Sequence, residues 1–424
     1  MPPSDSHSHG PDPDAPPPTP EALAQRRRAV WLMLLVLVPV GLATVVGLFA
    51  LWPDGKPTRA QRAADVASPP GTTYPEGRIV SVAPLDCSGG AAGQAQSCAT
   101  AVVEILDGEG KGEFQQIDLP PEVVAAGIGK DDTLVLTRDA GAEGGPAYGF
   151  SDYARGTPIV VLAIAFAVVV GLVARLRGLA ALVGLAFAFF ILFRFMLPGL
   201  LADESPVLVS LVGTSAIMFV VLYLAHGFSA RTTTALVGTL SGLFMVTVLG
   251  SVAVSAARLT GITSEETISL LGLDPTLDFS GLVLAGVVVA GLGVLNDVTI
   301  TQASAIWQLN EVSPDITWRE LYSRGMAVGR DHIASTVYTI VFAYAGAALP
   351  LLLLFELYSR PFTVSLFSSA VAEEVIRILV GAIALVLAVP LTTAVGAFVA
   401  KAADANVGAA ADRRMTALRA RFAR

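Results

Sequence analysis

The stretch AGVVVAGLGVLNDVTITQASAIWQL, from Ala285 to Leu309, is the most informative part of this chain. It begins as an apolar run of the kind that spans a membrane as a helix. Asn296 and Asp297 then stand side by side, and a carboxylate within a membrane helix is costly and usually functional. Gly291 and Gly293 precede them and suggest a break in the helix, which only a cavity or a protein interior would tolerate.

Composition places the whole chain in the same class. Of the 424 residues, 54% are hydrophobic and 15% are charged, and the mean hydropathy is +0.66. Repeated apolar runs of spanning length predict a polytopic α-helical membrane protein. The net charge of −8 and the lack of a basic, aromatic surface predict no nucleic-acid partner.

The predicted spans number eight, a first helix at residues 29–52 and a block of seven between residues 157 and 403. Lys and Arg cluster in alternate loops, which predicts that both termini are cytoplasmic in the plasma membrane. The seven spans of the block are Thr157–Ala174, Leu179–Leu197, Pro206–His226, Thr233–Ala256, Phe279–Ala303, Ile333–Phe355 and Val375–Ala400.

Residues 53–153 form a separate segment, predicted to be a small extracytoplasmic β domain. Its candidate strands are short and separated by turn-forming clusters, which favours an OB-like or SH3-like barrel. Cys87 and Cys98, the only cysteines, fall in this segment, and an oxidising compartment would favour a disulfide between them over two free thiols. The strands are expected at Gly77–Val82, Ala99–Leu106, Glu113–Leu119, Asp132–Thr137 and Ala147–Asp152.

The two ends of the chain carry no core of their own. Residues 1–25 are rich in Pro, Asp and Ser and predict a disordered cytoplasmic tail. Residues 404–424 predict a basic cytoplasmic tail.

Three segments of the membrane block resemble the YibE/YibF-like family of membrane proteins. The segments are GVLNDVTITQASAIWQL (Gly293–Leu309), GRDHIASTVYTIVFAYAGAALPLLLLF (Gly329–Phe355) and AEEVIRILVGAIALVLAVPLTTA (Ala372–Ala394). The resemblance covers the chain from about Tyr74 onward, and the arrangement with a β domain and membrane block on one chain is similar to the actinobacterial type. It implies export of manganese or another divalent cation.

The candidate transport path combines the polar residues of two predicted spans. Helical spacing places Asp297, Thr301 and Ser304 on one face, beside Asn296. The next-to-last span offers a matching row, in which residues again recur at helical spacing. That second row consists of Asp331, Ser335, Thr336 and Thr339.

Asp297 and Asp331 are the candidate metal ligands, and the Asp331 row is the expected partner of Asp297. Carboxylate and hydroxyl oxygens are hard ligands that suit Mn²⁺, Mg²⁺ or a proton. A structural alternative stays open, because Asp297 lies roughly 27 Å along its span and could simply cap a helix near the inner membrane boundary.

Further along, Glu373 and Arg377 are spaced to form an ion pair. A role for Glu374 at the outer, exit end of the transport path is a weaker prediction.

A gradient-driven transporter that exports a divalent cation such as manganese is the function that these features favour. No nucleotide-binding loop is present, no cofactor is expected, and the lack of hydrolase or protease motifs argues against an enzyme. The alternative is a non-transporting envelope assembly or scaffold protein whose β domain binds a partner. Its membrane polar groups would then be interhelical contacts worth about 0.6 kcal/mol each. The expected partners are the lipid bilayer and the cation, and a homo-oligomer stays an open alternative.

Overall fold

The computed structural model describes residues 20–67, 71–86, 97–141, 147–202, 204–357 and 361–422. Only the backbone is described at residues 20–26, 28–29, 67, 85–86, 97, 355 and 403–422. The chain divides into two compact units, which are described separately. One unit comprises Pro57–Arg175, and the other comprises residues up to Lys56 together with Leu176–Arg424.

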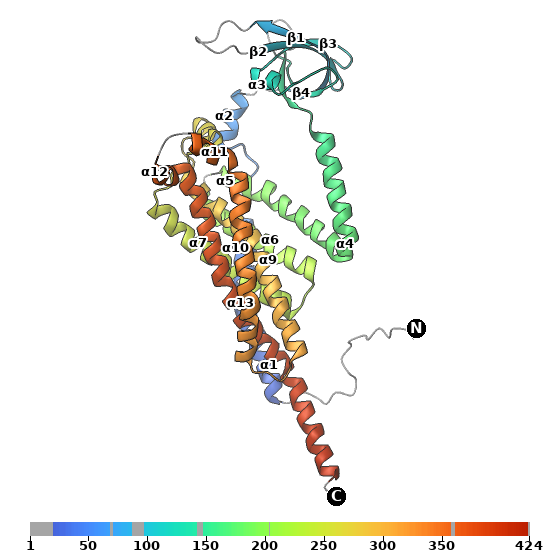
Figure 1. Cartoon of the computed structure of the whole chain (residues 1–424), viewed down its shortest axis with the longest axis vertical. Helices are drawn as coiled ribbons and strands as arrows, with labels where there is room; N and C mark the ends of the chain where they lie inside the picture. The colour runs from blue at the N-terminus through green and yellow to red at the C-terminus, as the bar shows by residue number, and fades with distance from the viewer. Residues whose placement is uncertain are drawn as a thin grey trace, which may run out of the picture. The chain divides into compact units, whose positions relative to one another are not determined.

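The smaller unit contains a five-stranded antiparallel sheet that closes nearly into a barrel (Figure 1). The five strands occur where the sequence predicts them. The strand order is β3-β2-β1-β4-β5, and the short helix α3 (Pro121–Ala125) lies between β3 and β4. The strands are β1 (Glu76–Asp86), β2 (Ser97–Ile105), β3 (Phe114–Leu119), β4 (Thr133–Asp139) and β5 (Ala147–Tyr153). Of the two barrel types expected, this partly open order favours the OB-like one.

Alternation along the strands builds the barrel core. Ile79, Val103, Leu134 and Leu136 are completely buried, while their neighbours in sequence face outward. Irregularities in the register between Ile79 and Ser81 of β1, and between Val135 and Leu136 of β4, are the kind of bulge that bends a strand. The apolar face of the bent sheet is thereby enclosed within one small core.

The larger unit is helical. Among the described residues of the whole chain, six helices are long and apolar enough to cross a membrane. Eight spans were expected. The six stretches are Val30–Ala50, Gly156–Leu200, Pro206–His226, Ala230–Ala256, Phe279–Val312 and Ser369–Ala402. The last of these belongs to α13 (Ser369–Phe422), whose backbone helix continues through most of the predicted basic tail.

Two differences between the predicted and the observed helices explain why six stretches, and not eight, are long and apolar enough to cross a membrane. The predicted spans at 157–174 and 179–197 belong to one stretch, in which Arg175 has non-helical angles (φ 54°, ψ −135°) inside α4 (Gly156–Ile191). A π-helix (Leu192–Met196) and α5 (Leu197–Leu200) complete that stretch. The predicted span at 333–355 is divided between α10 (Trp318–Ala347) and α11 (Leu349–Leu357), and neither of these two is both long and apolar enough.

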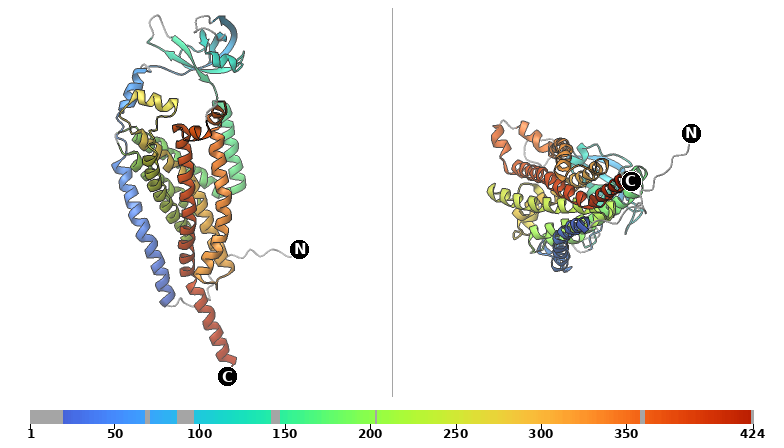
Figure 2. Two further views of the ribbon diagram at one scale, coloured as in Figure 1. Left: turned by 60° about the vertical axis from the view of Figure 1, so that its left-hand side comes forward. Right: turned by 90° about the horizontal axis from the view of Figure 1, so that it is seen from below.

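Helices α7 (Ala230–Ala256), α9 (Phe279–Val312) and α13 pack together as the centre of the larger unit, with α6 (Pro206–His226) and α1 (Pro20–Ala50) beside them (Figures 1 and 2). Small residues permit the close approach. A side chain at Gly242 of α7 would meet Leu295 of α9, and one at Gly250 would meet Leu284. The remaining helices described are α2 (Arg59–Ala67), α8 (Glu265–Leu273) and α12 (Phe362–Leu366).

Helix α9 is continuous through Gly291 and Gly293, so the suggested break at these glycines is wrong. The helix begins at Phe279, where the N-cap Asp278 accepts a hydrogen bond of 2.8 Å from the Gly281 N–H. Gly291 instead provides a close contact, because a side chain there would meet Val246 of α7. Asn296 and Asp297 therefore lie inside a helix and cap nothing.

Candidate functional site

Asp297 of α9 lies beside His332 of α10. The Asp297 Oδ2 atom is 4.0 Å from His332 Nε2, and the two side chains are 68% and 26% exposed. The Nε2 atom itself is buried and has no hydrogen-bond partner among the described residues. At this separation the two groups interact mainly through charge, and only when the imidazole is protonated.

The predicted polar face of α9 is turned outward. Asp297 and Thr301 are exposed, and Ser304 is half-buried. Asn296 is also half-buried, but its Oδ1 atom is buried without a partner among the described atoms. The helical spacing therefore correctly groups Asp297 with Thr301, while Asn296 has a different environment.

The predicted polar row of α10 is turned outward as well. Asp331, Ser335 and Thr339 are exposed, and Thr339 donates a 3.2 Å hydrogen bond to the Ser335 carbonyl. Thr336 is half-buried and donates to the His332 carbonyl at 2.9 Å. Within the described part of the chain, no hydrogen bond or ion pair joins Asp297 to Asp331. The sequence indicated the correct helix as the neighbour of Asp297, but His332 is the residue that approaches it.

The candidate metal ligands Asp297 and Asp331 are not accompanied by further ligands among the described residues. The described residues include no group of three or more His, Cys, Asp or Glu side chains that could hold a metal ion. Ions such as Mg²⁺ keep several water ligands and bind proteins through one or two carboxylates. The exposed carboxylates Asp297 and Asp331 therefore suit brief contact with a hydrated ion better than a closed site.

Gln302 is a buried polar residue that sequence reasoning missed. Its side chain is 1% exposed, and its Nε2 atom donates to the Gly325 carbonyl of α10 at 2.8 Å and to the Thr393 hydroxyl of α13 at 2.7 Å. Thr393 in turn donates to the Val389 carbonyl at 2.7 Å. One amide thus connects three helices and holds α10 against α9. It lies about one helical turn along α9 from the Asp297–His332 contact. Gln302 lies five residues after Asp297 and therefore on a different side of α9. The apolar residues on that side predict that it is buried, but they do not predict which groups Gln302 bonds to.

A second buried polar contact joins α7 to α9. The hydroxyls of Thr239 and Thr299 are 2.6 Å apart, and both side chains are completely buried. Thr392 of α13 approaches Gly238 so closely that a side chain at this glycine would collide with the Thr392 hydroxyl. The absence of a side chain at position 238 therefore permits the close packing of α7 against α13.

Near the C-terminal end of α10, a cavity of about 610 Å³ with both polar and apolar lining residues contains the pair Glu374 and Arg377. The Arg377 guanidinium donates to Glu374 at 2.7 Å, so the expected pairing of Arg377 with Glu373 is wrong. Glu373 instead is 7% exposed and accepts hydrogen bonds from the Gly261 N–H at 3.2 Å and the Thr263 hydroxyl at 2.9 Å. Glu373 therefore binds the loop after α7 and not Arg377. Residue spacing within α13 does not predict this contact, because the loop is distant in sequence.

Glu266 of α8 also lines this cavity. A hydrogen bond from the Ser264 side chain lowers the pKa of the Glu266 carboxyl below its usual value. Its charge therefore persists to lower pH than that of an ordinary exposed glutamate. The cavity presents carboxylates, one guanidinium and hydroxyls, which suits a polar solute.

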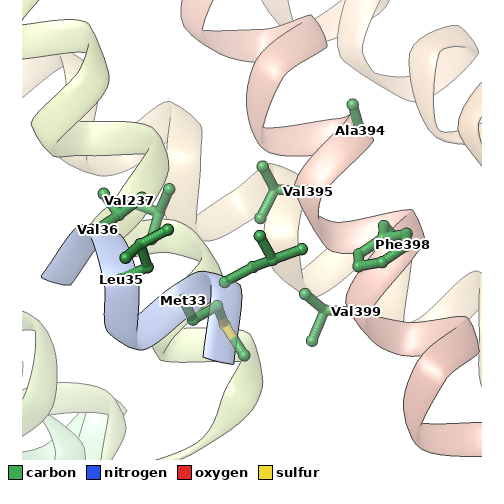
Figure 3. Close-up of a pocket in the computed structure, with 9 residues that line it drawn as sticks. Met33, Leu35, Val36, Val237, Ala394, Val395, Phe398 and Val399 are labelled. Atoms are coloured by element: carbon green, nitrogen blue, oxygen red, sulfur yellow. The ribbon is translucent and has the colours of Figure 1, made fainter. Parts of the chain in front are cut away.

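A further pocket is lined by apolar side chains (Figure 3). It has a volume of about 360 Å³ and lies between α1, α7 and α13. Met33, Val36, Val237 and Phe398 are among the side chains that line it. A hydrocarbon chain is the kind of molecule that such a surface accommodates.

The barrel shows no catalytic arrangement among its described residues. Cys98 is the second residue of β2, whereas Cys87 lies outside the described residues. The predicted disulfide between them therefore stays a prediction. Arg138 and Tyr148 form the main polar contact: the guanidinium donates to the Tyr148 hydroxyl at 3.1 Å and pairs with Glu109 at 2.7 Å. These contacts join the end of β4–β5 to the β2–β3 turn and are structural.

The described structure thus defines a largely helical protein with several helices compatible with a multi-pass membrane location and a nearly closed five-stranded barrel. The sequence model of the YibE/F-like protein family matches residues 162–402, which is more than half of the chain, and the chain belongs to this family. No curated protein and no solved structure matches it. The match covers the helices that carry Asp297, His332, Gln302 and Glu374, and it leaves out the barrel.

Proposed function

We propose that the protein is a gradient-driven membrane transporter that exports a divalent cation such as Mn²⁺. The observation that carries the proposal is the contact between Asp297 and His332, 4.0 Å apart on two helices packed within the membrane block. A carboxylate in such a helix is costly to retain without a function. Its 68% exposure leaves the carboxylate free to meet a cation.

The neighbouring residues leave room for a route between α9 and α10. On the side of α9 that carries Asp297, the residues are small: Gly286 and Ala290 are half-buried, and Gly293 has no atom within 4 Å of where a side chain would begin. The Arg377 guanidinium lies 3.7 Å from the side-chain position of Gly286. A route lined in this way would connect the cavity at Glu374 with Asp297.

The proposed location and orientation in the membrane rest on the charge pattern of the loops. We place the protein in the plasma membrane of an actinobacterial-type cell, with both termini in the cytoplasm and the barrel outside. The Cys87–Cys98 disulfide belongs to the same proposal, because it requires an oxidising compartment.

Measurement of cellular metal content, element by element, tests the proposal. Cells that produce the Asp297→Asn variant are expected to retain manganese, as cells without the protein do, while membrane levels of the variant stay normal. Asp315→Asn is the matched control, because Asp315 is an exposed carboxylate in the α9–α10 loop. Unchanged manganese content and metal tolerance in the Asp297→Asn cells would remove the main support for transport.

The assembly role of the barrel is the competing function, and a deletion separates the two. Removal of the barrel with the membrane block intact should leave some transport if the route lies between α9 and α10. If the isolated barrel segment captures an envelope protein, and the membrane block can be replaced by a single anchor without loss of phenotype, the assembly role is favoured instead.

A further inference from the structure

One face of α10 carries polar side chains that no described helix covers. Asp331, Ser335 and Thr339 recur at intervals of four residues and are exposed, and Tyr338 between them is 67% exposed. We call these four residues the α10 polar row. Asp297 of the adjoining helix is also exposed, at 68%.

The α10 polar row lies beside membrane-spanning segments and not in a loop. Ile340, next to Thr339, is 6% exposed and packs in a cluster with Val298 of α9 and with Leu385 and Val389 of α13. Figures 1 and 2 show α10 running along α13. The row therefore runs alongside α9 and α13, two helices that are long and apolar enough to cross a membrane. Within a bilayer, lipid could not satisfy its carboxylate or its hydroxyls.

Other outward faces of the same unit differ from this one. Helix α13 exposes Leu379, Ile383 and Leu387, and the second part of α4 exposes Phe189 and Phe190. These faces suit lipid, because they bear apolar side chains. The α10 polar row requires a protein or water on its outer side.

We propose that a second copy of this chain covers the α10 polar row, with a twofold axis along the membrane normal between the two α10 helices. About such an axis, each residue meets its own copy at the same depth. Hydroxyl groups both donate and accept, so a row of Ser335, Tyr338 and Thr339 can bond to an identical row.

The same symmetry brings the two Asp331 carboxylates to one depth. Two facing carboxylates repel each other, and a divalent cation between them removes that repulsion while adding favourable interactions with both. This step rests on the proposed function, because it adds a cation contact at the dimer interface to the proposed route between α9 and α10. It accounts for the absence of a three-ligand group among the described residues of a single chain.

An apolar helix is a poor alternative cover. The segment PIVVLAIAFAVVVGLV (Pro158–Val173) of α4 contains no polar side chain, so it would leave the α10 polar row unsatisfied. A second α10 supplies the hydroxyls and the carboxylate together.

Cysteine crosslinking of the full-length protein in its membranes tests the dimer. Ser335→Cys and Thr339→Cys are expected to give a covalent dimer upon mild oxidation, since each would face its own copy. Ile383→Cys and Leu387→Cys on the outer face of α13 are the matched controls, and the unsubstituted chain reports on Cys87 and Cys98. Dimer yields at Ser335→Cys and Thr339→Cys no higher than those of the controls would overturn the proposal. So would a crosslink between Ser335→Cys and Val168→Cys that stays within one chain, or a product that contains a different protein.

Added Mn²⁺ separates the dimer from the transport function. In the Ser335→Cys chain, Mn²⁺ is expected to raise the dimer yield at least twofold, and the additional Asp331→Asn change should abolish that increase. A dimer that forms equally with and without Mn²⁺ supports the interface but overturns the placement of the cation at Asp331. If the dimer forms while Asp297→Asn cells keep a normal manganese content, the interface stands and the transport proposal fails.

Discussion

The amide of Gln302 in α9 donates a hydrogen bond of 2.8 Å to the carbonyl of Gly325 in α10. Because residue 325 is a glycine, no side chain blocks access of the Gln302 amide to its carbonyl. Gly329, one turn later, also faces Gln302, and a side chain there would lie 3.1 Å from the Gln302 Oε1 atom. The position of α10 against α9, and hence of His332 beside Asp297, depends on this fit.

Replacement of Gln302 by Leu is expected to destabilise the helical unit by about 1–3 kcal/mol, because it removes the bonds to Gly325 and Thr393 and leaves the buried carbonyl without its donor. Thermal unfolding of the purified protein in detergent measures the change. Gln308→Leu, an exposed position on the same helix, is the control and should alter stability by less than about 0.5 kcal/mol. Equal effects at both positions would contradict the bridging role of Gln302.

Substitution of Gly238 by Ala is expected to cost about 1–3 kcal/mol, because the new methyl group collides with the Thr392 hydroxyl in a tightly packed interface. The additional change Thr392→Ala removes the colliding atom and should recover a large part of the loss. Gly293→Ala serves as the control, because nothing lies within 4 Å of that position. Its expected effect is neutral or stabilising, since alanine is the better helix former. A double variant no more stable than Gly238→Ala alone would show that the collision is not the cause.

Glu373 and Glu374 are adjacent and should respond very differently to replacement by Gln. Glu373 is buried and holds the loop after α7 through Gly261 and Thr263, whereas Glu374 pairs with Arg377 at a more open site. We expect Glu373→Gln to speed proteolytic cleavage in the loop at residues 257–264 several-fold, since the weakened hydrogen bonds release that loop. Glu374→Gln should leave cleavage there unchanged. Cleavage that increases equally in both variants would argue against a specific restraint by Glu373.

Much of the local structure could be predicted from the sequence. The alternation of apolar residues gave the five strands of the barrel, because residues along a strand face opposite sides in turn. Helical spacing correctly grouped Asp331, Ser335 and Thr339, which are all exposed on one face of α10. Long apolar runs indicated helices that could cross a membrane, although the span predicted at 333–355 is divided between α10 and α11.

The neighbours of each polar residue were decided by tertiary structure. Asp297 meets His332, Arg377 pairs with Glu374, and Gln302 connects α9 to α10 and α13. The pairing of helices distant in sequence is set by how glycines such as Gly238 and Gly325 fit against opposing side chains. Periodicity within one helix shows which residues share a face, but the core packing of several helices determines what that face meets.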